Sequence, residues 1–212
     1  MKLQKIAEIQ DAENIRDDII VHGSTDSEHD AALHQVLRKL EDSGFTLNVE
    51  KCMFKKPELV FFGLHFSAEG VKLCEDKKEA ILNAEKPTRV SELYSLAGLI
   101  NYAAKFIPNA ATLMHPFRDL MKKNAKWTWT TIHDNALNNI KASLTTDAMG
   151  YFDKSWDTEV TTDASPYGLG AVLAQLDPND SSRRRIIAYA SRRLTEVETR
   201  YAQIEREALG LV

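Results

Sequence analysis

The fold of this chain is constrained most by a helical middle section that lies between two ends with strand-like patterns. Apolar residues recur at helical spacing between Pro87 and Pro108, and further helices are expected over 109–123 and 131–144. Before them, two apolar runs flank the turn 67–70, which is typical of a hairpin. The sequence therefore predicts an α/β (α+β) chain with a helical module in its centre.

The first third of the chain adds one helix and more extended segments. Apolar residues follow helical spacing from the capping residues 24–26 to Gly44. Apolar and polar residues then alternate over 45–49, and the apolar runs 59–66 and 71–73 form the two arms of the hairpin.

The composition is that of an ordinary soluble globular protein, with 43% hydrophobic and 27% charged residues. The net charge of −4 gives no global basic field, so any binding of nucleic acid must be local. The amino terminus lacks an apolar signal core, and no apolar run approaches the roughly 18 residues of a membrane span. We therefore expect a soluble protein without a membrane partner.

Two adjacent carboxylates, Asp17 and Asp18, stand directly before a β-branched run that indicates a strand. Neighbouring side chains on a strand point to opposite faces, so a metal site here needs a further carboxylate from another strand. The alternative is an exposed acidic pair at the start of a strand.

A second pair of candidate acids lies near the carboxyl terminus. The strand 159–162 delivers Asp163 to a turn, and a returning strand over 169–173 makes an antiparallel edge. In the last helix, Glu207 borders an apolar stripe, whereas Glu205 points to solvent. The alternatives are a turn acid for Asp163 and a rim charge for Glu207. The residues of the stripe are Val197, Tyr201, Ile204, Ala208 and Leu211.

These elements occur together and in order, and over nearly its whole length the chain resembles the Pol polyprotein of gypsy-type LTR retrotransposons. The matching segments are 17–23, 47–52, 61–71, 96–102 with 106–108, 127–130, 162–165 with 168–173, and 205–209. The resemblance implies a residual reverse-transcriptase palm with a hairpin over residues 1–85. It further implies a helical thumb and connection over 86–145, and a partial RNase H-like mixed sheet over 146–212.

The resemblance also implies the roles of single residues. Asp17 and Asp18 match the acidic pair of the polymerase, and Asp163 and Glu207 match the first two metal-binding acids of RNase H. The hairpin with Phe62 and Gly63 resembles the primer grip. The implied cofactor is Mg²⁺, and the implied partner is an RNA–DNA hybrid or a primer–template duplex, or a complementary segment of Pol. The implied location is intracellular, either cytoplasmic within a virus-like particle or nuclear.

Departures from the family pattern leave open whether the isolated chain is an enzyme. Ile15 stands where the family commonly has an aromatic residue, and few residues precede Asp17. The chain also stops at Val212, so we expect both active sites to be incomplete in this fragment. The first hypothesis is that the chain is part of an active RNA-directed DNA polymerase and ribonuclease H. The second hypothesis is that the chain is a non-catalytic relic that binds nucleic acid or a protein.

Other charged and aromatic groups have two interpretations each. Lysines around the hairpin, Lys72 among them, are either phosphate contacts or a solvated face. The arginine triplet 183–185 is expected in a polar loop over 177–185, where it is either a solvated turn, the favoured interpretation, or a nucleic-acid contact. Trp127 and Trp129 are expected to pack rather than to stack on bases.

Overall fold

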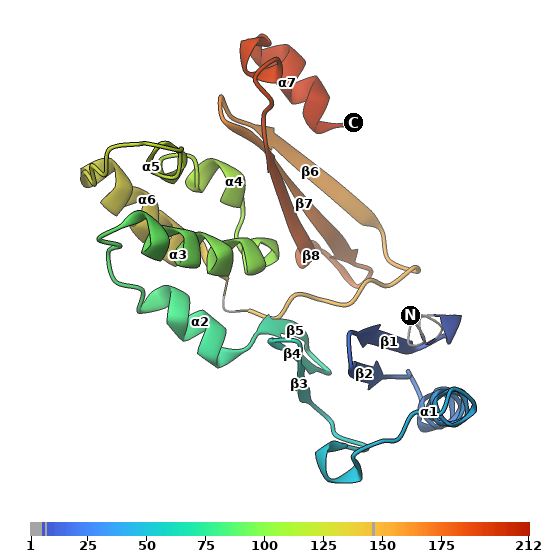
Figure 1. Cartoon of the computed structure of the whole chain (residues 1–212). Coiled ribbons are helices and arrows are strands. Elements are labelled where there is room, and N and C mark those ends of the chain that lie inside the picture. Colours follow the sequence, from blue (N-terminus) through green and yellow to red (C-terminus); the bar gives the residue numbers. More distant parts are fainter. Residues whose placement is uncertain (1–5, 7, 146) are drawn as a thin grey trace. The chain divides into compact units, whose positions relative to one another are not determined.

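The computed structural model describes residue 6 and the ranges 8–145 and 147–212, which form a mixed α/β chain (Figure 1). The predicted fold class is therefore confirmed. The chain divides into two compact units, Met1–Phe62 and Gly63–Val212, which are described separately. The three-module division given above stays a prediction.

The first unit begins with a β-hairpin that carries the acidic pair. Strand β1 (Ala12–Ile15) pairs antiparallel with β2 (Asp18–Val21), and Ile15 lies opposite Asp18. Arg16 and Asp17 therefore form a two-residue turn, in which Arg16 has a left-handed φ of 54°. Such short hairpin loops require positive φ because their twist must match that of the strands.

Helix α1 (Asp26–Asp42) follows the hairpin, as the sequence predicts. Its N-cap is Thr25, and the cap is reciprocal: Glu28 N donates to Thr25 Oγ1 at 3.2 Å, and Thr25 N donates to Glu28 Oε2 at 3.1 Å. The apolar face of α1 is buried against the hairpin. This small core consists of Ile6, Ala12, Val36 and Leu40, with Ile9, Ile19 and Val21 packed against it.

The alternating stretch after Gly44 is not a strand, so that prediction is wrong. Residues 45–48 have no regular structure, and Val49–Lys51 form a 3₁₀ turn, η2. The Asn48 side chain accepts a hydrogen bond from Glu50 N at 3.1 Å, and Val49 is 72% exposed. The hydrogen bond from the Asn48 side chain thus favours a 3₁₀ turn. The alternating residues do not form a strand, because there is no apolar surface for them to cover.

The predicted strand 59–66 is interrupted. Strand β3 (Leu59–Phe61) ends the first unit, and β4 (Leu64–Ser67) begins the second. Between them, Phe62 and Gly63 have left-handed φ values of 49° and 72°. Two consecutive residues in this region cannot continue a strand.

The second unit starts with the predicted hairpin. Strand β4 pairs antiparallel with β5 (Gly70–Leu73), and Ser67 lies opposite Gly70. The outer edge of β5 is paired as well, since Val71 and Met149 exchange backbone hydrogen bonds of 2.8 and 2.9 Å. The segment that follows the helices thus returns to the hairpin.

Helices α2 (Glu75–Leu82), α3 (Val90–Tyr102) and α6 (Thr131–Ser143) are the long helices of the middle section. The sequence predicts α3 and α6 but not α2. The Ser/Thr-x-x-acid pattern of Thr131 to Asp134 predicts a cap at Thr131, but the N-cap of α6 is Thr130, whose backbone N donates to His133 Nδ1 at 3.0 Å. Trp127 and Trp129 pack against the core of these helices, as predicted.

The predicted helix 109–123 is broken into α4 (Ala110–Leu113) and α5 (Phe117–Leu120). The break surrounds Pro116, because a proline disfavours the helical conformation of the residue before it. Both pieces contribute to the main core. Its largest fully buried side chains are those of Ile81, Leu93, Ile100, Phe106, Ile107, Phe117 and Ile140.

The carboxyl-terminal part contains a three-stranded sheet of β6 (Thr158–Ala164), β7 (Gly168–Asp177) and β8 (Asp180–Arg193). All three described strands are antiparallel, in the order β6-β7-β8, where a mixed sheet was predicted. The arginine triplet lies on β8 and not in a loop, because the turn is short and tight between Asp177 and Asp180. Figure 1 shows α4 and its neighbouring helices on one side of this sheet.

The chain ends in the 3₁₀ turn η4 (Glu198–Arg200) and helix α7 (Gln203–Gly210). The predicted apolar stripe is not its buried side, since Ile204 and Leu211 are 75% and 76% exposed. Leu209 makes the contact with the sheet instead. In the part of the chain that the structure describes, no helix has the length and apolar character needed to cross a membrane.

Candidate functional site

The predicted polymerase acids lie at the tip of the first hairpin. Asp17 is in the turn and Asp18 is the first residue of β2, and both are exposed. Ile19 and Val21 face the α1 core, so strand alternation places Asp18 with Ile20 on the other face. The hairpin thus presents two carboxylates away from its own core.

The predicted nucleic-acid contacts lie around the second hairpin. Gly63 is tightly enclosed, because a Cβ added there would lie 2.7 Å from the Tyr102 hydroxyl oxygen. Its carbonyl accepts a hydrogen bond from Cys74 N at 3.1 Å. Phe62, the last residue of the first unit, has 49% of its surface exposed.

Lys72 lies on β5 opposite His65. Its Nζ is 3.1 Å from Glu69 Oε2, so its charge is partly compensated within the hairpin. A phosphate contact by Lys72 would have to compete with that carboxylate.

The predicted RNase H acid Asp163 is on β6, opposite Gly170 of β7. Its side chain is exposed, and its Oδ2 accepts a hydrogen bond of 3.2 Å from Asn109 Nδ2. Asn109 caps the start of α4 with a left-handed φ of 53°. The first candidate acid is thus held by the helical module.

Glu207 lies on α7 and is exposed. Its Oε1 accepts a hydrogen bond of 3.0 Å from Gln203 Nε2, which also donates to the Ala164 carbonyl at 3.0 Å. One glutamine side chain therefore connects the second candidate acid to the strand of the first.

The two acids nevertheless start from opposite faces of the sheet. Ala164 is buried with Leu209 of α7. Asp163 precedes Ala164 on the strand and points the other way, towards Asn109. Gly170 shares the face of Asp163, and a Cβ at that glycine would collide with the Asn109 side chain. Helix α4 thus covers the face of Asp163, and α7 covers the reverse face.

This arrangement does not fit a complete magnesium site. Mg²⁺ needs several well-placed oxygen ligands. Among the described residues, no group of three or more His, Cys, Asp or Glu side chains is placed to hold a metal ion. The two RNase H candidates each bind a side-chain amide instead.

Sequence patterns alone missed a polar interface between α4 and the sheet. The Thr112 and Ser165 hydroxyls are 2.9 Å apart, and Ala111 N donates to Ser191 Oγ at 3.0 Å. His115 stacks on Tyr167 with ring centroids 3.8 Å apart. Burial lowers the pKa of His115, so its ring tends to be neutral in this stack. These residues lie far apart in the sequence and share no motif that would predict the contact.

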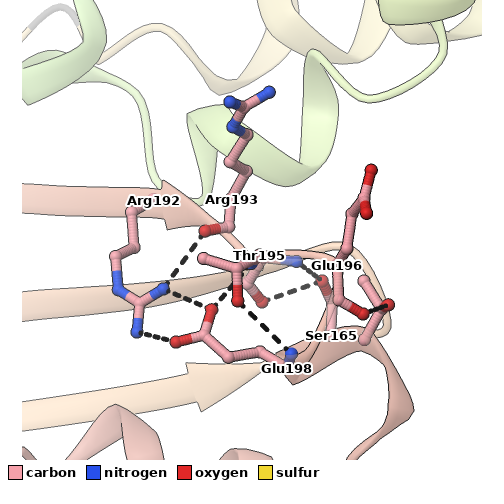
Figure 2. Close-up of polar contacts among 8 residues, drawn as sticks. Ser165, Arg192, Arg193, Thr195, Glu196 and Glu198 are labelled. Carbon is pink, nitrogen blue, oxygen red and sulfur yellow. Dashed lines mark hydrogen bonds and ion pairs between the residues drawn. The ribbon is translucent and has the colours of Figure 1, made fainter.

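A carboxylate clamp fixes the segment between β8 and η4. Figure 2 shows the Arg192 guanidinium facing the Glu198 carboxylate. The two bonds are 2.8 and 3.0 Å long, and Thr195 N donates to the same carboxylate at 2.7 Å. These donors lower the pKa of Glu198 from its ordinary value of 4.5 to about 2.

Two arginines of the triplet, Arg184 and Arg185, also have structural partners. Arg184 makes a bidentate contact of 2.8 and 3.2 Å with Glu159 of β6. Arg185 lies over the Trp156 ring, 3.9 Å from its centroid. These contacts brace the far end of the sheet.

Comparison with known families matches residues 129–212 to the RNase H-like domain found in reverse transcriptase. The Transposon Tf2-3 and Tf2-4 polyproteins of Schizosaccharomyces pombe are 32% identical to the chain over 197 residues, or 92% of its length. The chain spans about 15% of the length of these polyproteins.

Solved structures of reverse transcriptases also match the chain. The foamy viral protease-reverse transcriptase dRH in complex with double-stranded DNA matches with 25% identity and a TM-score of 0.76. That match covers 99% of this chain and 37% of the foamy viral chain. A foamy viral protease-reverse transcriptase in complex with an RNA/DNA hybrid matches with a TM-score of 0.75 and 25% identity, over 99% of this chain and 28% of its own. The chain therefore belongs to the Pol polyproteins of gypsy-type LTR retrotransposons, as a reverse-transcriptase segment that contains an RNase H-like domain.

Proposed function

We propose that this chain is a duplex-binding segment of a retrotransposon reverse transcriptase and that it has no catalytic activity on its own. The matched foamy viral structures contain double-stranded DNA or an RNA/DNA hybrid, which supports a duplex as the ligand. Affinity would come from phosphate contacts made by local basic groups, since the net charge of the chain is −4.

The activities proposed for the whole polyprotein are RNA-directed DNA polymerisation and hydrolysis of RNA paired with DNA. Asp17 and Asp18 are the candidate polymerase ligands, and Asp163 and Glu207 are the candidate RNase H ligands. A divalent metal held by such carboxylates would activate the attacking oxygen and stabilise the leaving oxygen. The contribution of the chain would be to supply carboxylates to such sites.

The proposed inactivity of the isolated chain rests on one observation. Asp163 faces Asn109 and α4, whereas α7, which bears Glu207, packs on the reverse face of the sheet. Two carboxylates that start from opposite faces do not form the shared ligand set that hydrolysis requires.

The test uses the purified 212-residue chain. Fluorescence anisotropy with a labelled RNA–DNA hybrid should show binding that weakens as salt increases. Primer extension and hybrid cleavage in Mg²⁺ should be equally absent for the parent, Asp17→Asn, Asp163→Asn and Glu207→Gln. Absence of hybrid binding would refute the first half of the proposal. Cleavage by the parent that Glu207→Gln abolishes would refute the second half.

A second candidate function is association with a complementary segment of Pol. The observation that favours it is the exposed apolar side of the last helix and its preceding turn, where Val197 and Ile204 are 62% and 75% exposed. Analytical ultracentrifugation of the chain with and without a separately expressed downstream segment of the polyprotein tests this function. Unchanged sedimentation of the mixture would count against it.

A further inference from the structure

The second unit contains a groove that none of the candidate sites uses. It lies between α3, the α4–α5 segment and the end of β8, and its volume is about 560 Å³. One wall is apolar and includes Tyr94, Met114 and Met121. The rest of the lining is rich in arginine.

Three arginines line the groove, namely Arg118, Arg192 and Arg193. No aspartate or glutamate is among the described residues that line the groove. Arg192 is neutralised by Glu198, which lies outside the lining. Two positive charges, those of Arg118 and Arg193, therefore face the groove without a carboxylate on its walls.

Both of these arginines are positioned for an anion. Arg118 Nη2 donates to the Ala111 carbonyl at 2.9 Å, which anchors the guanidinium at the groove. Burial and the nearby charge of Arg193 lower the pKa of Arg118. Figure 2 shows the Arg193 side chain extending away from the Arg192–Glu198 pair. A bound anion would relieve the repulsion between the two guanidinium groups.

The apolar wall gives the groove a second property. The Tyr94 hydroxyl donates to the Met121 carbonyl at 2.7 Å, which fixes the orientation of its ring. At Gly98 an added Cβ would meet no atom within 4 Å, so the α3 side of the groove is open. The volume lies in the usual range for small-ligand sites. It suits one flat apolar group attached to one anion.

We propose that this groove holds a single unpaired nucleotide of a bound nucleic acid, with its phosphate at Arg118 and Arg193 and its base against Tyr94 and the methionines. A paired base cannot enter, because its partner strand would not fit a groove of this size. The occupant is therefore a nucleotide at a strand end or overhang. This inference rests on the proposed binding of duplex nucleic acid.

The experiment compares a blunt RNA–DNA hybrid with the same hybrid that carries a short single-stranded overhang. The parent chain should bind the overhang hybrid roughly tenfold more tightly, as stacking and a phosphate contact would give. Arg193→Gln should abolish this preference. The matched control is Arg200→Gln, an exposed arginine outside the groove that should keep the preference.

A second variant tests the apolar wall without changing charge. Gly98→Leu fills the open side of the groove and should also abolish the preference, while circular dichroism confirms that the variant is folded. Equal affinity of the parent for both hybrids would overturn the inference and leave duplex binding intact. Equal losses in Arg193→Gln and Arg200→Gln would overturn it too, since they would indicate a diffuse charge effect.

A further experiment distinguishes a nucleotide at a strand end from a free nucleotide as the occupant of the groove. A free nucleoside 5′-monophosphate is titrated against the chain while the methyl signals of Met114 and Met121 are followed by NMR. We expect shifts of these signals only at concentrations far above those at which the overhang hybrid produces them. Binding of the monophosphate as tightly as the overhang would overturn the assignment to a strand end.

Discussion

The Asn109 side-chain amide donates a hydrogen bond of 3.2 Å to the Asp163 carboxylate, and so joins the start of α4 to the centre of a candidate active site. Asn109 holds a left-handed φ of 53°, a conformation that asparagine tolerates better than most residues. Gly170, opposite Asp163, leaves the space that the Asn109 side chain occupies. The three residues therefore depend on one another.

Replacement of Asn109 should separate its two roles. Asn109→Ala loses the hydrogen bond and also strains the left-handed backbone, so unfolding should become easier by about 1–2 kcal/mol. Asn109→Gly loses only the hydrogen bond and should cost about half as much. Urea denaturation measures both values. Equal costs for the two variants would show that the backbone conformation contributes nothing.

Gly170→Ala should destabilise the chain by about 1–3 kcal/mol, because the new methyl group would displace the Asn109 side chain. Combining it with Asn109→Gly removes the obstructing side chain. The double variant should therefore be more stable than the sum of the single effects predicts, with a coupling of about 1 kcal/mol. Strict additivity in this double-mutant cycle would contradict the contact.

The Glu198 clamp predicts a dependence of stability on acid. The folded-state pKa of about 2 is lower than the ordinary value of 4.5. The Glu198 carboxylate therefore makes its full contribution to the free energy of unfolding above about pH 4.5. This contribution is lost as the pH falls through about 2. Thermal melting of the parent and of Glu198→Gln should differ at pH 7, and the difference should shrink across this window.

The control for the clamp is Glu196→Gln. Glu196 is exposed, and within the described structure its carboxylate takes part in none of the ion pairs. Its melting curve should follow that of the parent at every pH. A constant difference between the parent and Glu198→Gln from pH 7 to pH 2 would rule out the ionised carboxylate as the cause.

Gly63→Ala should be clearly destabilising, by roughly 1–2 kcal/mol or more. The left-handed φ of 72° opposes a side chain, and the added Cβ would crowd the Tyr102 hydroxyl at 2.7 Å. The same substitution at Gly98, inside α3 and in open space, should stabilise the chain by about 0.5–1 kcal/mol. Chemical denaturation of the two variants should thus shift in opposite directions.

Two isoleucines of α6 provide a matched test of the core. Ile140 is fully buried, whereas Ile132 is 64% exposed. Ile140→Ala should cost about 2–5 kcal/mol, and Ile132→Ala should stay within about 0.5 kcal/mol. Similar losses at both sites, measured by urea denaturation, would contradict the packing of this helix.

Periodicity and capping were sufficient to predict much of the fold. The spacing of Val36 and Leu40 and the stop at Gly44 gave α1, and the apolar residues of α3 gave the helix that contains Leu93 and Ile100. The turn 67–70 gave the hairpin of β4 and β5. In each case a local signal agreed with the apolar surface that the element buries.

Other elements were decided by signals that periodicity does not contain. Pro116 breaks a stretch that otherwise has helical spacing, and Phe62 and Gly63 interrupt an apolar run by their backbone conformation. The side of α7 that packs was also predicted wrongly. Leu209 packs against a cluster that includes Ala164, which lies 45 positions earlier in the chain.

The candidate acids could be named only through the resemblance to a family. A lone Asp at the end of a strand and a Glu on a helix are common, so local pattern favoured ordinary surface roles. Their assignment as metal ligands stays a prediction. The contact between Asn109 and Asp163 could not be predicted, because it joins two positions that share no motif.

Side chains alternate between the two faces of the sheet along β6, so the number of residues between two positions decides whether they share a face. Removing or inserting one residue between Val160 and Asp163 would move the acid from the α4 face to the α7 face, and a change of two would return it. The length of β6 at this point therefore determines the face to which Asp163 points. Inserting or deleting a single codon there would bring Asp163 to the side of Glu207.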